Sequence, residues 1–341
     1  MKQIRTQDAV GHVLCHDITR IVRGVSKGAA FRKGHVVMQE DIPALLALGK
    51  EHLYVWENHP GLLHENDAAE ILYAICANAH MKPSEVKEGK IEVRADTDGF
   101  FCVDVERLKK VNSLGEMMIA TRHTHSPVKK GAVLAGTRII PLMIAEEKMQ
   151  KARQAAGAAP LLTLYPYAPK TVRIVTTGSE VYKGLIQDTF TPVLREKIAE
   201  YGAVEMGQVL LDDDPVAITA AITNFVQQGA DLVLCSGGMS VDPDDKTPLA
   251  IKNAAASVVS YGVPVLPGAM FMLAYTASGI PVMGLPGCVM YAKRTVFDLV
   301  LPRIMANMPL DAGDLAALGH GGLCLGCEVC IFPNCAFGSG V

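Results

Sequence analysis

Strand-like and helix-like segments alternate along the second half of the chain, and this rhythm limits the possible folds more than any other feature. From residue 171 to about residue 307, apolar runs such as TVRIVTTG, DLVLC and IPVMGLPG are separated by amphipathic segments such as TPVLREKIAEYG. Strands that alternate with helices are typical of βαβ units and a mostly parallel sheet. We therefore predict an α/β domain over residues 171–310.

The rest of the chain has a different organisation. Residues 1–150 contain short apolar runs separated by turn residues, which predicts a mixed α+β domain. The stretch 151–170, KARQAAGAAPLLTLYPYAPK, is rich in Ala and Pro and reads as a linker. Residues 311–341 form a tail that contains four closely spaced cysteines.

The composition gives no reason to expect nucleic acid or a membrane as a partner. The 341 residues are 50% hydrophobic and 20% charged, with a formal net charge of -3, so nothing favours nucleic acid or an anionic membrane as a partner. We find no run of about 18 uninterrupted apolar residues that would span a membrane. The segment MKQIRTQDAVGHV lacks the apolar core of a signal peptide, so we expect a cytoplasmic protein.

Small residues and glycines follow three of the predicted strands. In a mostly parallel sheet, ligands bind beyond the carboxyl ends of the strands, so these loops are expected to share one edge. Glycine lets backbone N–H groups approach a bound anion closely, and hydroxyls add hydrogen bonds. We predict a phosphate or oxyanion pocket formed by Thr177, Gly178, Ser179, Ser236, Gly237, Gly238, Ser240, Pro286 and Gly287.

Carboxylates gather in the same loops. A phosphate pocket lined by these acids would repel its ligand unless a cation intervened, and Mg²⁺ is commonly held by one or two carboxylates plus substrate phosphates. The alternative is purely structural, with Asp214 as a helix cap and with Asp244 and Asp245 in a solvated turn. The acidic candidates are Glu180, Asp213, Asp214, Asp242, Asp244 and Asp245.

Four motifs in this half of the chain resemble those of the molybdopterin-binding domain. They are TTGSE, DDDP, SGGMS and GLPG, in this order. The domain is shared by MogA-type adenylyltransferases, MoeA-type molybdenum insertion enzymes and CinA-like proteins. The segments GHVLCHDI and GAAFRKGHVVMQEDIPALLALGKEHLYV resemble those that precede the domain in MoeA-type proteins, which favours that branch.

The resemblance implies a three-layer domain that holds a pterin phosphate in its glycine loops. In the MoeA type, molybdate or tungstate is inserted into adenylylated molybdopterin, with Mg²⁺ present and with release of AMP. Carried over to this sequence, the catalytic candidates are Glu180, Asp244, Asp245 and Lys246, and the metal candidates are Asp242 and Asp244. The resemblance also implies a homo-oligomer and a client molybdoenzyme as partners.

Some positions depart from the MoeA pattern. Phe190 and Cys288 stand where the family usually has asparagine, and Ser179 stands where it usually has an acidic residue. These departures keep two alternatives open. One is a non-catalytic protein that binds or carries the molybdenum cofactor and whose metal-bearing tail docks with a client or senses redox state. The other is a CinA-like nucleotide pyrophosphatase that hydrolyses ADP-ribose without any pterin, and the N-terminal segments argue against it.

The tail carries the spacing Cys324-x2-Cys327-x2-Cys330-x4-Cys335. Thiols this close together in a cytoplasmic protein favour a metal site over disulfides. Cys-x2-Cys-x2-Cys followed by a further Cys is similar to the iron–sulfur runs of ferredoxins, whereas a four-cysteine zinc site fits the same number of ligands. The tight spacing favours the iron–sulfur cluster, and zinc remains the alternative.

Overall fold

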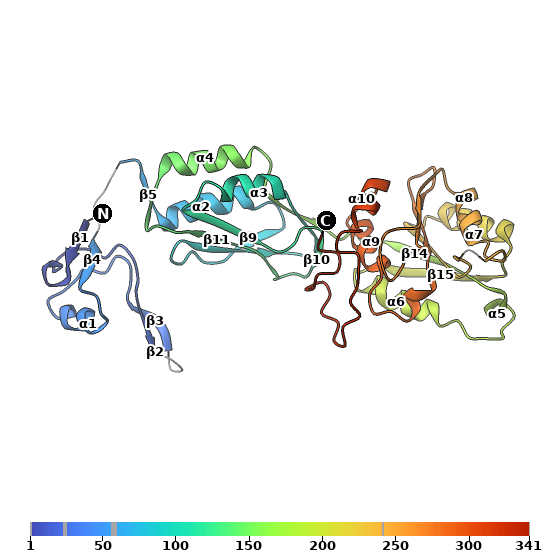
Figure 1. Ribbon diagram of the computed structural model, residues 1–341, viewed down its shortest axis with the longest axis horizontal. Coiled ribbons are helices and arrows are strands. Elements are labelled where there is room, and N and C mark those ends of the chain that lie inside the picture. The colour runs from blue at the N-terminus through green and yellow to red at the C-terminus, as the bar shows by residue number, and fades with distance from the viewer. Residues whose placement is uncertain (1, 23–25, 56–59, 241, 341) are drawn as a thin grey trace.

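The computed structural model describes residues 2–22, 26–55, 60–240 and 242–340. They form three lobes that follow one another along the long axis of the molecule (Figure 1). We call them the N-terminal lobe, residues 2–55, the middle lobe, residues 62–166, and the C-terminal lobe, residues 171–340. Within the described ranges, no helix is long and apolar enough to cross a membrane.

The N-terminal lobe is small and has its own apolar core around Leu14, Ile18, Leu45 and Leu53. Strand β1 pairs with β4, and β2 pairs with β3, both antiparallel. Its elements are β1 (Lys2–Arg5), the 3-10 helix η1 (Thr6–Asp8), β2 (Ile18–Val22), β3 (Ser26–Phe31), α1 (Asp41–Ala47) and β4 (His52–Val55).

The middle lobe packs three helices against small antiparallel sheets. Alternating burial along β7 and β11 turns one face of their sheet toward the helices, where Leu72, Val93 and Leu134 are fully buried. Its elements are β5 (Leu62–His64), α2 (Glu65–Cys76), β6 (Met81–Pro83), β7 (Lys90–Ala95), β8 (Gly99–Val103), α3 (Val105–Asn112), β9 (Met117–Thr121), β10 (Ser126–Val128), β11 (Val133–Ile139), β12 (Met143–Ala145), α4 (Glu146–Ala156) and β13 (Leu162–Pro166).

Residues 151–170 differ from the predicted linker. The first part completes helix α4, and β13 pairs antiparallel with β8 of the middle lobe. Alanine is the strongest helix former, and Leu162 and Leu164 are buried in the middle lobe's core. The composition of the stretch suggested a spacer, but its apolar residues bind it into a core.

The C-terminal lobe is built on a six-stranded sheet in the order β15-β14-β16-β19-β18-β17. The first four strands are parallel, and β17 and β18 are antiparallel. Its elements are β14 (Thr171–Thr177), α5 (Ser179–Tyr182), α6 (Phe190–Ala199), β15 (Val204–Leu211), α7 (Pro215–Gln227), β16 (Leu232–Ser236), α8 (Thr247–Ala254), β17 (Ser257–Tyr261), β18 (Met272–Tyr275), β19 (Pro281–Leu285), the 3-10 helix η2 (Gly287–Met290), α9 (Val296–Met305) and α10 (Ala312–Ala317).

Apolar residues cover both faces of this sheet. Alternate residues of β14 and β16 point to opposite sides, so Ile174 and Leu234 pack with helices α6 and α9, and Val175 and Val233 pack with α7 and α8. Strands buried on both faces read as continuous apolar runs, as DLVLC does. Each of these strands ends where the buried run ends, and its loop begins at the next residue.

The middle and C-terminal lobes contact each other directly. Lys129 Nζ of the middle lobe donates to the Glu200 carbonyl at 2.8 Å, and the N–H of Ala168, in the short connection between the lobes, donates to the Met305 carbonyl at 2.8 Å. The guanidinium of Arg303 on α9 lies 5.7 Å from the centre of the Phe100 ring on β8. Strand β8 therefore lies next to the helix that covers one face of the large sheet.

Candidate functional site

Four loops of the C-terminal lobe begin at the same edge of the parallel sheet. In the strand register, Thr176 lies opposite Ser236, Ser236 lies opposite Leu285, and Thr177 lies opposite Leu211. The loops after β14, β15, β16 and β19 thus start side by side, at the carboxyl ends where α/β sheets bind ligands. We call this region the strand-exit site.

Three oxygen atoms, from the end of β14, the loop after β15 and the start of α8, surround Gly238. A Cβ added at this glycine would lie 3.0 Å from Thr247 Oγ1 and 3.3 Å from both Asp213 Oδ1 and Thr177 Oγ1. The two hydroxyl oxygens are themselves 3.0 Å apart. Thr177 and Thr247 are buried, so these oxygens hold fixed positions beneath the glycine loop.

Gly237 allows the backbone of the loop after β16 to contact the last residue of β14 closely. Its φ is +90°, and a Cβ at this position would lie 2.1 Å from the carbonyl oxygen of Thr177. A side chain is therefore excluded by both the backbone conformation and the space available. This close approach places the glycine loop directly against the three oxygens.

Asp213 is the carboxylate that the fold places inside this cluster. Its Oδ2 accepts a hydrogen bond of 3.1 Å from the Ser179 N–H, whereas its Oδ1 is buried and has no partner among the described residues. Burial raises the pKa of Asp213, and the nearby charges of Asp212 and Asp245 raise it further, against the opposing effect of the Ser179 hydrogen bond. A buried carboxylate oxygen without a partner is suited to accept a proton, a hydrogen bond or a cation.

Two of the other predicted acidic residues, Asp242 and Asp245, stabilise their own turn. Asp245 Oδ2 accepts from the Ser240 N–H at 2.6 Å, and Asp242 Oδ1 accepts from the Asp244 N–H at 3.1 Å. Lys246 Nζ donates to the carbonyl of Pro243. The carboxylates of these aspartates thus accept hydrogen bonds from backbone N–H groups of the same turn and stabilise it.

Asp214 and Glu180 also lie outside the oxygen cluster. Asp214 caps helix α7, since its Oδ1 accepts from the Val216 N–H at 2.9 Å. Glu180 is exposed on the short helix α5. Among the residues that the structure describes, no three His, Cys, Asp or Glu side chains are grouped to hold a metal ion. The predicted acidic magnesium site around Asp242 and Asp244 is therefore not preformed.

Two residues of the site had no motif to mark them. Thr247 begins helix α8, where Thr followed by Pro reads only as a helix start. Gln208 on β15 contacts Asp188 Oδ2 at 2.5 Å, Thr191 Oγ1 at 2.7 Å and Thr176 Oγ1 at 3.1 Å. Gln208 thus ties the segment after β14 to the sheet, and only the pairing of β14 with β15 reveals this role.

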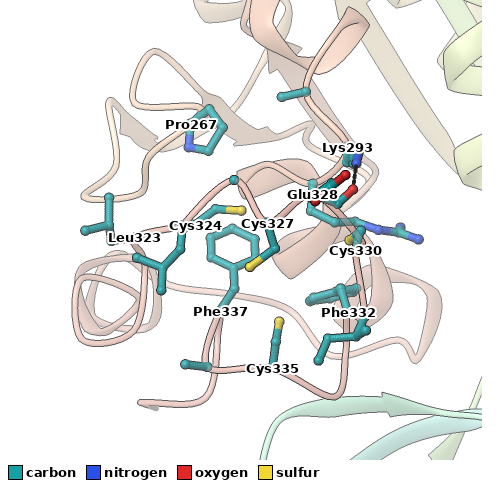
Figure 2. A pocket seen from close by; sticks show the side chains of 16 residues that line it. Pro267, Lys293, Leu323, Cys324, Cys327, Glu328, Cys330, Phe332, Cys335 and Phe337 are labelled. Atoms are coloured by element: carbon teal, nitrogen blue, oxygen red, sulfur yellow. Dashed lines mark hydrogen bonds between the residues drawn. The ribbon is translucent and has the colours of Figure 1, made fainter.

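The four tail cysteines lie apart from the strand-exit site. All of them line one cavity of about 450 Å³, together with apolar side chains and the basic residues Lys293 and Arg294 (Figure 2). Cys324 and Cys335 are half-buried against the core, whereas Cys327 and Cys330 are exposed. The thiols do not converge on one point as the ligands of a single metal ion would.

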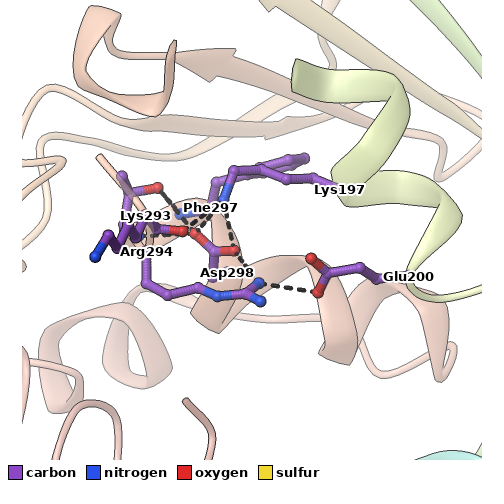
Figure 3. Close-up of polar contacts among 7 residues, drawn as sticks. Lys197, Glu200, Lys293, Arg294, Phe297 and Asp298 are labelled. Atoms are coloured by element: carbon purple, nitrogen blue, oxygen red, sulfur yellow. Dashed lines mark hydrogen bonds and ion pairs between the residues drawn. The ribbon is translucent and has the colours of Figure 1, made fainter. Parts of the chain in front are cut away.

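A buried ionic network supports the segment that borders this cavity (Figure 3). Asp298 is 2% exposed and accepts hydrogen bonds of 2.8 and 3.0 Å from Lys197 Nζ, 2.8 Å from Arg294 Nη1 and 2.7 Å from the Thr295 N–H. The same Arg294 reaches Glu200 at 2.9 Å. Helices α6 and α9 are thereby joined next to the cysteines.

Family models match two separate parts of the chain. Residues 3–57 match a domain of unknown function (DUF8806). Residues 173–306 match a model described as "Probable molybdopterin binding domain".

Among the curated relatives are short matches named CinA-like protein. One from Mycolicibacterium vanbaalenii is 41% identical over 75 residues, which is 22% of this chain and 18% of the relative. Another from Pseudothermotoga lettingae is 35% identical over 85 residues, which is 25% of this chain and 21% of the relative. The chain thus spans about a fifth of the length of these relatives.

One similar solved structure is the molybdopterin biosynthesis enzyme MoaB of Thermus thermophilus. It is 23% identical, with a TM-score of 0.36, and the match covers 41% of this chain and 98% of that one. The family match over residues 173–306 contains every loop of the strand-exit site. Residues 173–306, which contain the strand-exit site, are thus similar to the molybdopterin-binding domain model.

Proposed function

We propose that the strand-exit site binds the phosphate end of adenylylated molybdopterin and inserts molybdate or tungstate into the pterin, releasing AMP. The observation that carries this proposal is the buried, unpartnered Oδ1 of Asp213 beside the Thr177 and Thr247 hydroxyls. The family match over residues 173–306 supports a pterin as the ligand. The MoeA-like segments near the N-terminus favour insertion over adenylyl transfer.

The oxygen donors of the site fit Mg²⁺ in kind. Asp213 Oδ1 and the two hydroxyl oxygens are hard donors, and Mg²⁺ commonly completes its coordination with substrate phosphates and water. Asp213 would hold the ion, which when bound offsets the charge of the phosphoanhydride. The Ser179 N–H keeps Asp213 oriented, and Gly237 keeps the glycine loop close enough to reach the phosphate.

The same geometry supports a second candidate, a protein that binds the cofactor without catalysis. Lys246, Asp242 and Asp245 contact their own loop rather than the oxygen cluster. If they keep these contacts when the pterin is bound, only Asp213 remains to assist the reaction. A carrier would need the glycine loops but no catalytic carboxylate.

AMP release from adenylylated molybdopterin separates the two candidates. The assay contains Mg²⁺ with either molybdate or tungstate, and pterin binding is measured in parallel by titration calorimetry. We expect oxyanion-dependent AMP release that Asp213→Asn abolishes while most of the binding remains. Asp67→Asn, on the exposed start of α2 in the middle lobe, is the matched control and should change neither quantity.

Two results would reject the insertion reaction. Tight pterin binding without AMP release would establish the carrier. Hydrolysis of ADP-ribose without pterin binding would instead establish the third interpretation of the sequence, a CinA-like pyrophosphatase. A homo-oligomer, a client molybdoenzyme and a cytoplasmic location remain predictions, which size-exclusion chromatography with light scattering, affinity capture and cell fractionation would test.

A further inference from the structure

Residues 321–338, which we call the cysteine loop, form a long excursion that is closed at its base. The Gly338 N–H donates to the Gly321 carbonyl at 2.9 Å, and the Leu266 N–H donates to the Gly322 carbonyl at 2.9 Å. The Cys324 N–H returns a bond of 2.8 Å to the Leu266 carbonyl. The loop contains no helix or strand, and loops of this length without secondary structure are usually functional or disordered.

The cysteine loop has little apolar core of its own. Leu325 is 78% exposed and Val329 is 73% exposed, whereas Phe337 is buried in the core of the C-terminal lobe. A segment that cannot bury its apolar residues needs another source of order, and bound metal commonly supplies it in cysteine-rich segments. The loop is anchored at its two ends, and its middle depends on what its thiols bind.

The thiols could hold either a single zinc ion or a centre with several metal atoms, and the two need different arrangements of sulfur. Four sulfur ligands of one zinc ion lie about 2.3 Å from the metal and about 4 Å from one another. No such convergence exists among the described residues, yet Cys324, Cys327, Cys330 and Cys335 all line one cavity of about 450 Å³. A cavity of this size lined by four thiols has room for a centre with several metal atoms, each of which takes its own sulfur ligands.

The surroundings of the cavity suit a negatively charged centre. An iron–sulfur cluster with four thiolate ligands carries net negative charge, and cations at its edge stabilise it. Lys293 lines the cavity and donates through Nζ to the Glu328 carbonyl at 2.6 Å. The guanidinium of Arg294 lies 5.1 Å from the centre of the Phe332 ring. Both basic residues therefore hold the loop, and Lys293 contributes positive charge at the cavity, whereas the charge of Arg294 is already offset by Asp298 and Glu200.

We infer that the cysteine loop binds an iron–sulfur cluster through Cys324, Cys327, Cys330 and Cys335. Four S–H bonds are replaced by four Fe–S bonds, and four protons are released to solvent. Ligation itself transfers no electron. Cys327 and Cys330, which are exposed, reach the cluster as the loop closes around it, while Cys324 and Cys335 start from positions against the core.

Anaerobic reconstitution of the full chain with ferric iron, sulfide and a thiol, which reduces part of the iron, tests this inference. We expect bound iron and acid-labile sulfide in equal amounts, with the visible charge-transfer absorption of an iron–sulfur cluster. The double variant Cys327→Ser/Cys330→Ser should lose both signals. Because these two cysteines are exposed, their replacement should leave the folded lobe intact, which circular dichroism would check. Cys102→Ser, outside the loop, is the matched control and should bind the cluster normally.

A parallel titration with zinc alone gives the opposing outcome. Binding of one zinc per chain that the double variant abolishes, with no iron–sulfur absorption after reconstitution, would overturn the inference and establish a zinc site. Absence of both metals would overturn it as well. Pterin binding at the strand-exit site is measured on the same samples, so a failure of the cluster is distinguished from a failure of the proposed pterin function.

Discussion

The strand-exit site and the cysteine loop belong to one lobe but are ordered in opposite ways. At the strand-exit site, buried strands place the oxygens of Thr177, Thr247 and Asp213 around Gly238 before any ligand arrives. The cysteine loop is fixed at its base and by a few side chains, and Leu325 and Val329 remain exposed. The fold therefore preorganises the strand-exit site, whereas the cysteine loop is expected to become ordered when it binds its ligand.

The largest expected effect comes from the buried network that borders the cysteine loop. Asp298→Ala leaves Lys197 and Arg294 without their buried carboxylate, and the loss of one partner of a buried ion pair commonly costs about 3–5 kcal/mol. Urea unfolding followed by circular dichroism should show this loss. Since Arg294 also contacts Phe332, limited proteolysis should cut the cysteine loop faster.

Glu200→Ala is the control for this variant. It removes the more exposed partner of the same arginine, where an ion pair is worth about 1 kcal/mol or less. Equal losses for the two variants would mean that burial of Asp298 does not set the strength of the network.

A second prediction affects the strand-exit site and spares the cysteine loop. Gly237→Ala places a Cβ 2.1 Å from the Thr177 carbonyl oxygen at a φ of +90°, so the two loops must separate. Backbone strain of this kind costs about 1–3 kcal/mol, and pterin affinity should fall with it. Calorimetric titration measures the affinity. Gly279→Ala, with a similar φ of +78° and open space around it, should leave the affinity unchanged.

A smaller, pH-dependent effect is expected at Asp213. Because its pKa is raised, the native state holds the proton to a higher pH than the unfolded chain does, and stability falls as pH rises through that pKa. Asp213→Asn should therefore raise the free energy of unfolding at neutral pH, with no such gain at acid pH, where both states are protonated. Urea titrations at several pH values would show this. A gain that persists at acid pH would contradict the assignment.

The smallest effect on stability is expected for Lys293→Ala. The exposed ammonium group holds the Glu328 carbonyl, and its removal should change the free energy of unfolding by about 0.5 kcal/mol or less. Cleavage within the cysteine loop should nevertheless become faster in limited proteolysis. Lys252→Ala, on helix α8, is the control. Unchanged cleavage would show that the loop is ordered without this tether.

The sequence predicts the sheet of the C-terminal lobe well because each of its central strands is buried on both faces. Runs such as DLVLC and IPVMGL therefore stand out, and the glycine loops follow them directly. The predicted linker over 151–170 is wrong because alanine and proline are typical of linkers only by composition, whereas burial of Leu162 and Leu164 places the stretch in the middle lobe.

The side chains of the site were less predictable than its loops. Asp242 and Asp245 look like ligands in the sequence, but in the fold they close a turn. An aspartate that bonds a neighbouring N–H has the same sequence context as one that faces a ligand. Thr247 lies far along the chain from Thr177, and only the packing of helix α8 against the sheet brings their hydroxyls together.

The separate apolar cores of the three lobes have a thermodynamic consequence. The N-terminal and middle lobes each enclose their own cluster, and the C-terminal lobe divides its core between the two faces of one sheet. Unfolding of such a chain is not expected to be all-or-none, because each lobe can unfold separately from the others. A single melting temperature would then average several transitions, and calorimetry would resolve the lobe to which each substitution belongs.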